Sequence, residues 1–418
     1  MVEDYDLVIR NASLRGREGL FDIAVRSGVI EEVGRVSGRG AVEIDAGKGL
    51  VTEAFTNPHL HMCKVYTYLM IGEEAVRHYQ ASGMGGAMAA IEIASKVKER
   101  YGEGWIYRNA RRAAMEAVAN GTLYIRAFAD TDTKAGLEGV KALLRLKDEL
   151  GDFITIQVVA FPQDGVVRDP GAEEYVRKAV EMGADVVGGI PWIEYTEEDE
   201  WEHINRVFAI AKEFNRDVAM LTDDAGDPSL RTTEKLARKA VKEGWVGRVT
   251  ACHARAMSTY PEPYLRKVAS LIRMAGLSLV TDPHTGPLHL PVKFMLSQGV
   301  NVALGQDDIA DAYYPYGRNN MLEVAFLASH ILWSMTLSDM DTFLDMITWR
   351  GARAMGLRNY GVRVGSVADL LVHRYRTPYE LVWRHEPPRY VVRRGRVLVE
   401  NVGGPKYGDP RLGLNSSP

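Results

Sequence analysis

The chain contains few cysteines and no long uncharged apolar run. Only Cys63 and Cys252 occur among its 418 residues, which is too few for a disulfide framework. Glycine or a charged residue interrupts each apolar stretch well before the roughly 20 residues that a membrane-spanning helix needs. The first six residues have neither the basic nor the apolar segment of a signal peptide. We therefore expect a cytoplasmic protein that does not span a membrane.

Blocks of charge of one sign are also absent. The chain mixes 51 basic and 55 acidic residues along its length, for a formal net charge of -4. No basic block could follow a phosphate backbone, so nucleic acid is not an expected partner. With 46% hydrophobic and 25% charged residues, the composition is that of a globular protein long enough for a large core and a smaller attached module. This composition is compatible with a homo-oligomer.

Both ends of the chain have short apolar runs that predict strands. The predicted strands span residues 5–10, 22–26 and 29–33 near the N-terminus, and residues 366–372 and 390–399 near the C-terminus. Glycine, serine and asparagine separate them, as is typical of turns. We expect residues 1–52 and 362–410 to form one small β-sandwich domain, with residues 411–418 as a tail.

The middle of the chain, residues 53–361, alternates short β-branched runs with amphipathic helical segments such as 139–150 and 233–243. This alternation favours parallel strands joined by crossover helices. The predicted strand ends lie at residues 59–61, 124–130, 158–163, 186–190, 218–224, 249–253, 279–282 and 302–308. Eight such units predict an α/β fold, a (β/α)8 TIM barrel, with the active site at the carboxyl ends of its strands.

Polar side chains are concentrated at these strand ends. His59 and His61 follow the first strand, and because side chains alternate along a strand, both imidazoles can reach one cation. The other candidates are Gln163, Asp223, Asp224, His253, His284, Asp307 and Asp308. Some of them can have purely structural roles, and Asp308 is the better candidate for a helix cap.

Four segments carry a resemblance to a known family. They read VAFPQDG at 159–165, GADVVGGIP at 183–191, VTACH at 249–253, and GQDD at 305–308 followed by YPYG at 314–317. In this order they resemble the amidohydrolase superfamily, and more narrowly cytosine deaminase. The resemblance implies one divalent metal ion, zinc or iron, held by His59, His61, a histidine of the fifth strand and Asp307. Such an ion lowers the pKa of bound water, so that hydroxide is available near neutral pH.

The resemblance also implies roles for the remaining residues. Asp224 would move protons, His253 would polarise the nucleophilic water, and Asp307 would serve both catalysis and the metal. Gln163 would read the amide edge of a ring, since a carboxamide can both donate and accept hydrogen bonds. Tyr313 stands in place of a tryptophan of cytosine deaminase and would hold the ring with Gln163. His284 belongs to no motif, but it follows the seventh predicted strand, so we expect it to face the pocket.

One position departs from the family pattern in a way that affects the metal. Cytosine deaminase has a fifth-strand histidine followed three residues later by a glutamate, whereas this chain has Leu221 and Asp224. Leucine cannot bind a metal, so another ligand has to replace it. We favour His253, which borders the metal-bound water in the related enzymes. The alternatives are Cys63, which would share a strand face with His61, and a carboxylate of Asp223 or Asp224.

The predicted function is metal-dependent hydrolysis of a C-N bond. The expected partner is a small heterocyclic amine or amide, and deamination of an aminopyrimidine or aminotriazine is the leading reaction. One alternative is hydrolysis of an N-substituted or cyclic amide on the same scaffold. The other is a non-catalytic or metal-free barrel, as the loss of a ligand at Leu221 would allow. Nothing in packing alone demands His59, His61 and Asp307 together, which favours the enzyme.

Overall fold

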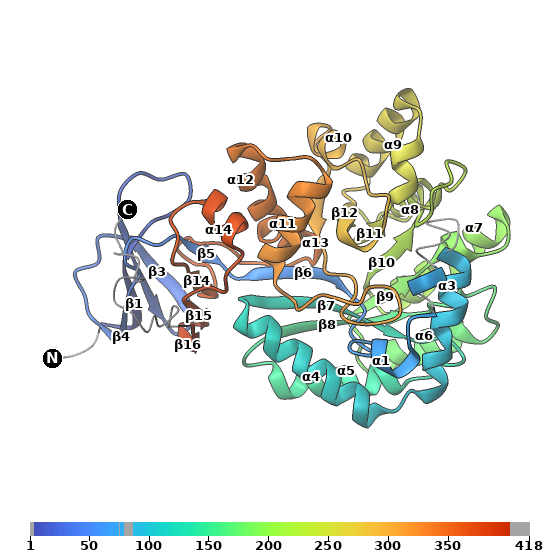
Figure 1. Ribbon diagram of the computed structural model, residues 1–418, viewed down its shortest axis with the longest axis horizontal. Coiled ribbons are helices and arrows are strands. Elements are labelled where there is room, and N and C mark those ends of the chain that lie inside the picture. Colours follow the sequence, from blue (N-terminus) through green and yellow to red (C-terminus); the bar gives the residue numbers. More distant parts are fainter. Residues whose placement is uncertain (1–3, 75, 79–86, 402–418) are drawn as a thin grey trace.

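Eight parallel strands form the central sheet of the computed structural model, which describes residues 4–74, 76–78 and 87–401 (Figure 1). The strands are β6 (Phe55–Leu60), β7 (Thr122–Asp130), β8 (Thr155–Phe161), β9 (Val186–Gly189), β10 (Asp217–Thr222), β11 (Val249–His253), β12 (Ser278–Thr281) and β13 (Asn301–Leu304). Each strand pairs in parallel with the next one along the chain. The predicted TIM barrel is confirmed.

The barrel closes where the chain beyond β13 returns to the end of β6. The backbone N-H of His61 donates to the carbonyl oxygen of Asp307 at 2.8 Å, and the N-H of Asp307 donates to the carbonyl oxygen of His59 at 2.9 Å. Gly305 makes this approach possible, because a Cβ atom added there would lie 2.9 Å from the Cβ of His59. Barrel closure therefore brings His59, His61 and Asp307 together.

Helices cover the outside of the barrel (Figure 1). The helices described between β6 and β14 are α1 (Tyr68–Ile71), α3 (Ala87–Ala94), α4 (Glu103–Ala119), α5 (Glu138–Leu150), α6 (Ala172–Met182), α7 (Glu197–Glu213), α8 (Thr232–Glu243), α9 (Glu262–Met274), α10 (Val292–Ser297), α11 (Met321–Ile331), α12 (Leu337–Met346) and α13 (Trp349–Ala354). In α5 the residues at helical spacing, Val140, Leu143 and Leu146, are buried against the strands. The helices predicted at 139–150 and 233–243 are confirmed as α5 and α8.

Two four-stranded sheets lie beside the barrel (Figure 1). One contains β1 (Tyr5–Ala12), β2 (Phe21–Arg26), β3 (Val29–Gly34) and β4 (Gly40–Asp45), and the other contains β5 (Val51–Glu53), β14 (Leu370–Val372), β15 (Tyr390–Arg393) and β16 (Arg396–Glu400). A short helix, α14 (Pro378–Arg384), connects β14 to β15. Side chains of both sheets, among them Ile9 and Leu370, share one apolar core. The expected small sheet module from both chain ends is confirmed.

The C-terminal strands differ from the predicted ranges in two ways. The run 390–399 is two strands, because Arg394 and Gly395 have φ angles of 47° and 75° and turn the chain back between β15 and β16. The run 366–372 is a strand only from Leu370, and Asp369 just before it accepts hydrogen bonds through its side chain. The predicted tail 411–418 lies outside the described residues.

A buried ion pair joins the second small sheet to the barrel. Asp369 accepts hydrogen bonds from Arg393 and from the Tyr124 hydroxyl of β7, each at 2.5 Å. Arg393 also donates to the hydroxyl of Thr155 on β8 at 2.7 Å. The side chains of the ion pair are 3% exposed, so neither charge can return to water without local opening.

We expect Asp369→Ala to lower the free energy of unfolding by about 3 to 5 kcal/mol, because the charge of Arg393 would stay buried without its partner. Urea denaturation measures the change. Glu262→Ala is the control, since Glu262 pairs with Arg266 on the exposed surface of α9, and its loss should cost at most about 1 kcal/mol. An unchanged unfolding midpoint for Asp369→Ala would show that the ion pair contributes nothing to the free energy of unfolding.

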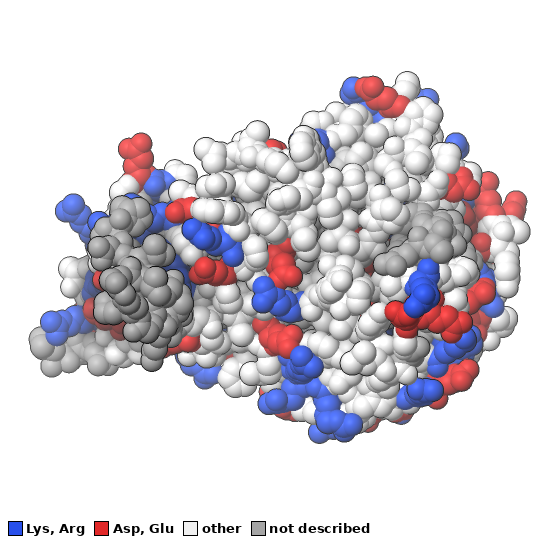
Figure 2. All heavy atoms as spheres, viewed as in Figure 1, with Lys and Arg blue, Asp and Glu red and all other residues white. Residues whose placement is uncertain are grey.

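The surface in Figure 2 carries basic and acidic side chains interspersed among uncharged ones, without a broad area of one sign. This distribution agrees with the mixed charge of the sequence. Among the described residues, no helix combines the length and the apolar character that crossing a membrane requires.

Candidate active site

Two groups of potential metal ligands lie at the carboxyl ends of the barrel strands. The first group contains His59, His253, Asp282 and Asp307, and the second contains His61, Asp307 and Asp308. Within each group the ligand atoms lie within 4.8 Å of one another, and all of these residues are buried. Asp307 belongs to both groups, so it lies at the centre of the cluster.

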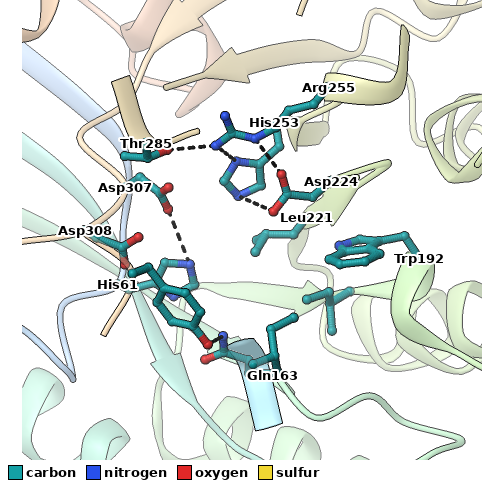
Figure 3. Close-up of a pocket in the computed structure, with 13 residues that line it drawn as sticks. His61, Gln163, Trp192, Leu221, Asp224, His253, Arg255, Thr285, Asp307 and Asp308 are labelled. Carbon is teal, nitrogen blue, oxygen red and sulfur yellow. Dashed lines mark hydrogen bonds and ion pairs between the residues drawn. The ribbon is translucent and has the colours of Figure 1, made fainter. Parts of the chain in front are cut away.

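Both histidines of the first strand turn the same ring nitrogen toward Asp307. The Nε2 atom of His59 lies 3.0 Å from Oδ1 of Asp307, and the Nε2 atom of His61 lies 3.7 Å from that oxygen, as Figure 3 shows for His61. Burial lowers the pKa of His61 well below its ordinary value, which keeps the imidazole neutral and able to bind a cation. Burial alone would raise the pKa of Asp307, but the three neighbouring histidines hold it well below the ordinary range.

The residues present fit a divalent ion. Imidazole and carboxylate ligands suit zinc and iron alike. The cluster also leaves several buried atoms without a hydrogen-bond partner among the described residues, namely Nδ1 of His59, Nδ1 of His61 and Oδ2 of Asp282. The Nε2 atoms of both histidines face Asp307, so these Nε2 atoms are the ones placed to bind an ion, and the unpartnered atoms lie outside that set of ligand atoms.

His253 is oriented by a carboxylate of the next strand. Its Nδ1 donates to Oδ1 of Asp282 at 3.0 Å, which leaves Nε2 as the free ring nitrogen. The ring stands edge-on to His59 with 5.0 Å between the centroids. Burial opposes the charged imidazolium, but Asp224, Asp282 and Asp307 outweigh it and raise the pKa of His253 to about 9. Its φ of 68° is strained for a non-glycine residue, as is often seen at functional sites.

Asp224 faces His253 from the end of the fifth strand. Its Oδ2 lies 3.9 Å from Nε2 of His253, and its Oδ1 accepts a hydrogen bond from Nε of Arg255 at 2.6 Å (Figure 3). The same guanidinium donates to Asp282 at 3.1 Å and to the hydroxyl of Thr285 at 2.7 Å. Arg255 thus connects the carboxylates that follow β10 and β12.

Two residues of the site, Arg255 and Asp282, were not predicted from the sequence. No motif marked either residue. The one feature of the sequence that could have indicated them is their position, because Arg255 lies two residues after His253 and Asp282 directly follows the seventh strand.

Two of the proposed replacement ligands are not brought to the cluster. The Sγ atom of Cys63 accepts a hydrogen bond from the N-H of Asp130 at 3.4 Å and lies 3.5 Å from the Tyr101 hydroxyl, and burial raises the pKa of the thiol to about 12. Asp223 instead accepts hydrogen bonds from the backbone N-H groups of Thr232 and Thr233 at the start of α8. Neither residue belongs to a group of potential ligands within the described part of the chain. Both alternatives are therefore corrected.

A pocket opens beside the cluster, with one polar and one apolar side. It is lined by His61, Ile91, Gln163, Ile190, Trp192, Leu221, Asp224, His253, Arg255, Thr285, Asp307, Asp308 and Tyr313. Leu221, Ile190 and Trp192 belong to one apolar cluster, and all three line the pocket. Leu221 therefore supplies apolar surface to the pocket.

The expected substrate-binding residues divide between the pocket and its surroundings. Gln163 and Tyr313 both line the pocket, and Nε2 of Gln163 donates to the Tyr313 hydroxyl at 3.2 Å. His284 is not among the lining residues. Its Nε2 contacts the carbonyl oxygen of Gln306 at 3.1 Å, and its ring packs edge-on against Tyr314. The expectation that His284 faces the pocket is corrected.

Comparison with known proteins agrees with this geometry. Residues 42–399 match the model of the amidohydrolase family. The chain is 33% identical over 404 residues to N-isopropylammelide isopropyl amidohydrolase of Pseudomonas sp. strain ADP, covering 96% of this chain and 99% of the relative. It is 25% identical over 406 residues to a pterin deaminase of Rhizobium rhizogenes, covering 91% and 89% of the two chains.

The similarity extends to solved structures. The crystal structure of 5-methylcytosine deaminase from Klebsiella pneumoniae liganded with phosphonocytosine matches with a TM-score of 0.88 and 29% identity, covering 96% of this chain and 100% of that chain. The resemblance to cytosine deaminase is confirmed, and the non-catalytic barrel is set aside, because the relatives are amidohydrolases and deaminases acting on C-N bonds. The chain belongs to the amidohydrolase family and is an enzyme that acts on non-peptide C-N bonds.

Proposed function

We propose that the enzyme removes an exocyclic amino or alkylamino group from a small nitrogen heterocycle by hydrolysis, with one divalent ion, zinc or iron, as cofactor. The observation that carries this proposal is the position of Asp307, which meets His59 and His253 in one group of potential ligands and His61 in another, beside a pocket at the carboxyl end of the barrel. The similar proteins named for action on isopropylammelide, pterin and 5-methylcytosine support a planar heterocycle as substrate.

The ion would be held by His59, His61, Asp307 and His253, with His253 giving up its Nε2 proton to the solution and taking the place of a fifth-strand ligand. When bound, such an ion makes water available as a nucleophile near neutral pH. Asp282 accepts a hydrogen bond from Nδ1 of His253 and so orients the imidazole ring, as carboxylates commonly do for metal-binding histidines. Leu221 is therefore compatible with a complete set of four protein ligands.

The reaction moves both protons of the water, one to the leaving nitrogen and the other to the ring nitrogen beside the attacked carbon. The water oxygen forms a bond to the ring carbon, the exocyclic C-N bond breaks, and the ring gains a carbonyl group while ammonia or an amine departs. Asp224 is the proposed proton carrier, because its Oδ2 faces the site while Arg255 holds its other oxygen. Gln163 and Tyr313 would hold the ring from the polar side of the pocket.

The apolar side of the pocket favours an N-alkylated amine as a second candidate substrate. Leu221, Ile190 and Trp192 are at most 5% exposed and present hydrocarbon where an alkyl substituent could pack. Contact between an alkyl group and these side chains would stabilise the bound substrate by the hydrophobic effect.

We expect Leu221→Ala to lower kcat/KM for an N-isopropylamino heterocycle about ten-fold more than for the matching unsubstituted amine, because the removed side chain would no longer contact the alkyl group. Steady-state kinetics on the two substrates measure the ratio, and the unsubstituted amine is the internal control. An equal loss for both substrates would show that Leu221 does not face the substituent.

A panel of amino- and alkylaminopyrimidines and triazines tests the proposed function. Release of ammonia or amine should require the divalent ion, stop on chelation and return when zinc or iron is added. If the metal-loaded enzyme turns over none of these compounds, the proposed substrate class is wrong.

A further inference from the structure

Lys64 is a buried cation at the polar side of the pocket. Its side chain is 4% exposed, and its Nζ donates a hydrogen bond to Oε1 of Gln163. Nζ also lies 3.5 Å from Oδ1 of Asp130 and 5.6 Å from the centre of the Tyr313 ring. The amide of Gln163 is therefore held between Lys64 and Tyr313.

The charge on Lys64 decides which way the amide of Gln163 turns. An ammonium group donates hydrogen bonds and cannot accept them, so the amide must direct its oxygen toward Lys64. Burial alone would lower the pKa of Lys64, but the neighbouring acidic groups, of which Asp130 acts most strongly, together outweigh burial and raise the pKa above its ordinary value. The amide nitrogen of Gln163 is then left to donate to the Tyr313 hydroxyl at 3.2 Å.

Two donors on this side of the pocket remain available to a ligand. The amide of Gln163 has a second N-H group, and the Tyr313 hydroxyl keeps its own proton, because burial raises the pKa of this phenol well above its ordinary value. Within the described residues neither of these protons has an acceptor, and both side chains line the pocket. In Figure 3, Gln163 lies across the pocket from His253 and Asp224.

These two donors fit one kind of acceptor best. Because Nε2 of Gln163 and the Tyr313 oxygen are only 3.2 Å apart, both can donate to the same ligand atom. A carbonyl oxygen has two lone pairs and can accept both bonds, whereas an unprotonated ring nitrogen has one lone pair and an amino group presents hydrogens instead.

We propose that Lys64 fixes Gln163 as a hydrogen-bond donor, so that the enzyme takes heterocycles with a ring carbonyl on the edge that faces Gln163 and Tyr313. The proposal rests on the proposed function, in that the occupant of the pocket is a heterocycle. Lys64 is a positioning residue that acts through Gln163. The expectation that this carboxamide both donates to and accepts from a ring is replaced by donation alone.

Binding of a matched pair of compounds tests the proposal. Pyrimidin-2-one and 2-aminopyrimidine differ in having a carbonyl or an amino group at one ring position. We expect the metal-loaded enzyme to bind pyrimidin-2-one about 100-fold more tightly by isothermal titration calorimetry, because an amino group would leave both donors unpaired. Equal affinity for the two compounds would overturn the proposal.

Two variants separate a polarity effect from a structural one. In Gln163→Glu the carboxylate still pairs with Lys64 but can only accept, so the preference should reverse toward 2-aminopyrimidine. In Lys64→Met the amide is free to rotate, so the preference should shrink to about three-fold or less, while Lys64→Arg should retain it because a guanidinium also only donates. An equal loss of affinity for both compounds in Gln163→Glu would overturn the proposal, since a merely structural role predicts that result.

Hydrolysis is measured separately on the same protein. A binding preference for pyrimidin-2-one without any C-N hydrolysis would contradict the proposed function and leave the role of Lys64 supported. Hydrolysis of aminoheterocycles without a binding preference for the carbonyl compound would support the proposed function and contradict the role of Lys64. Near-ultraviolet circular dichroism shows whether each variant retains the native fold.

Discussion

The variant His253→Ala is expected to lose its divalent ion and, with it, hydrolytic activity. Leu221 offers no donor atom, so removal of His253 would leave only His59, His61 and Asp307 as protein ligands. Loss of an outer-shell partner typically costs 10- to 100-fold in metal affinity, so loss of a ligand should weaken binding by more than about 100-fold. Elemental mass spectrometry after dialysis against a competing chelator measures the retained ion.

Two further variants serve as controls for His253→Ala. Cys63→Ala should retain the full metal content, because the thiol contacts Asp130 and Tyr101 and no potential ligand of the cluster. Asp282→Asn should show an intermediate loss of about 10- to 100-fold in affinity, since the amide would hold the His253 ring less firmly than the carboxylate does. A fully metal-loaded His253→Ala would exclude His253 as a ligand.

Asp307→Asn is expected to lower kcat/KM by about 10⁴-fold with little effect on the fold. The carboxylate lies 3.0 Å from His59 and 3.7 Å from His61, and it lines the pocket. The bonds that close the barrel at this residue are made by its backbone, so they survive the substitution. Steady-state kinetics and thermal unfolding measured on the same preparation test both parts of the expectation.

Asp217→Asn is the matched control for this change. Asp217 begins β10 at the opposite end of the barrel and accepts a hydrogen bond from Arg248 at 2.7 Å. Residues at that end of a TIM barrel serve stability and not catalysis, so kcat/KM should stay within about two-fold of the wild-type value. Retention of more than about a tenth of the activity by Asp307→Asn would show that its carboxylate is dispensable for the reaction.

Sequence patterns predicted the barrel because its strands and helices differ in period and alternate regularly. Each of the eight predicted strand ends overlaps an observed strand, although several of their polar residues lie in loops just beyond it. This offset explains why the prediction of Cys63 as an alternative metal ligand was wrong. Strand β6 ends at Leu60, so the alternation that would place Cys63 beside His61 no longer applies two residues further on.

The contacts that complete the site depend on residues far apart in the chain, which no local pattern encodes. Asp282 reaches His253, and Arg255 reaches Asp224, only because β10, β11 and β12 are neighbours in the closed barrel. The proposed role of Lys64 could not be predicted from a local sequence pattern either. Gln163 was predicted to bind substrate, but its proposed role as a donor follows from a lysine that lies 99 positions earlier, in the loop after β6.

Asp223 shows how neighbouring polar residues can have separate roles. Both Asp223 and Asp224 follow β10, and the sequence offered either one as a ligand. A φ of 49° at Asp223 turns the chain, and its carboxylate satisfies the N-H groups at the start of α8, which helix starts require. Asp224 is left to face His253.

The metal content of the wild-type protein tests the central claim most directly, namely that the site is complete despite Leu221. Elemental mass spectrometry on protein loaded with zinc or iron and then dialysed should find about one ion per chain, and chelation should abolish hydrolysis until the ion is restored. Protein that retains no ion after loading, or that hydrolyses a heterocyclic amine equally well after chelation, would contradict the account.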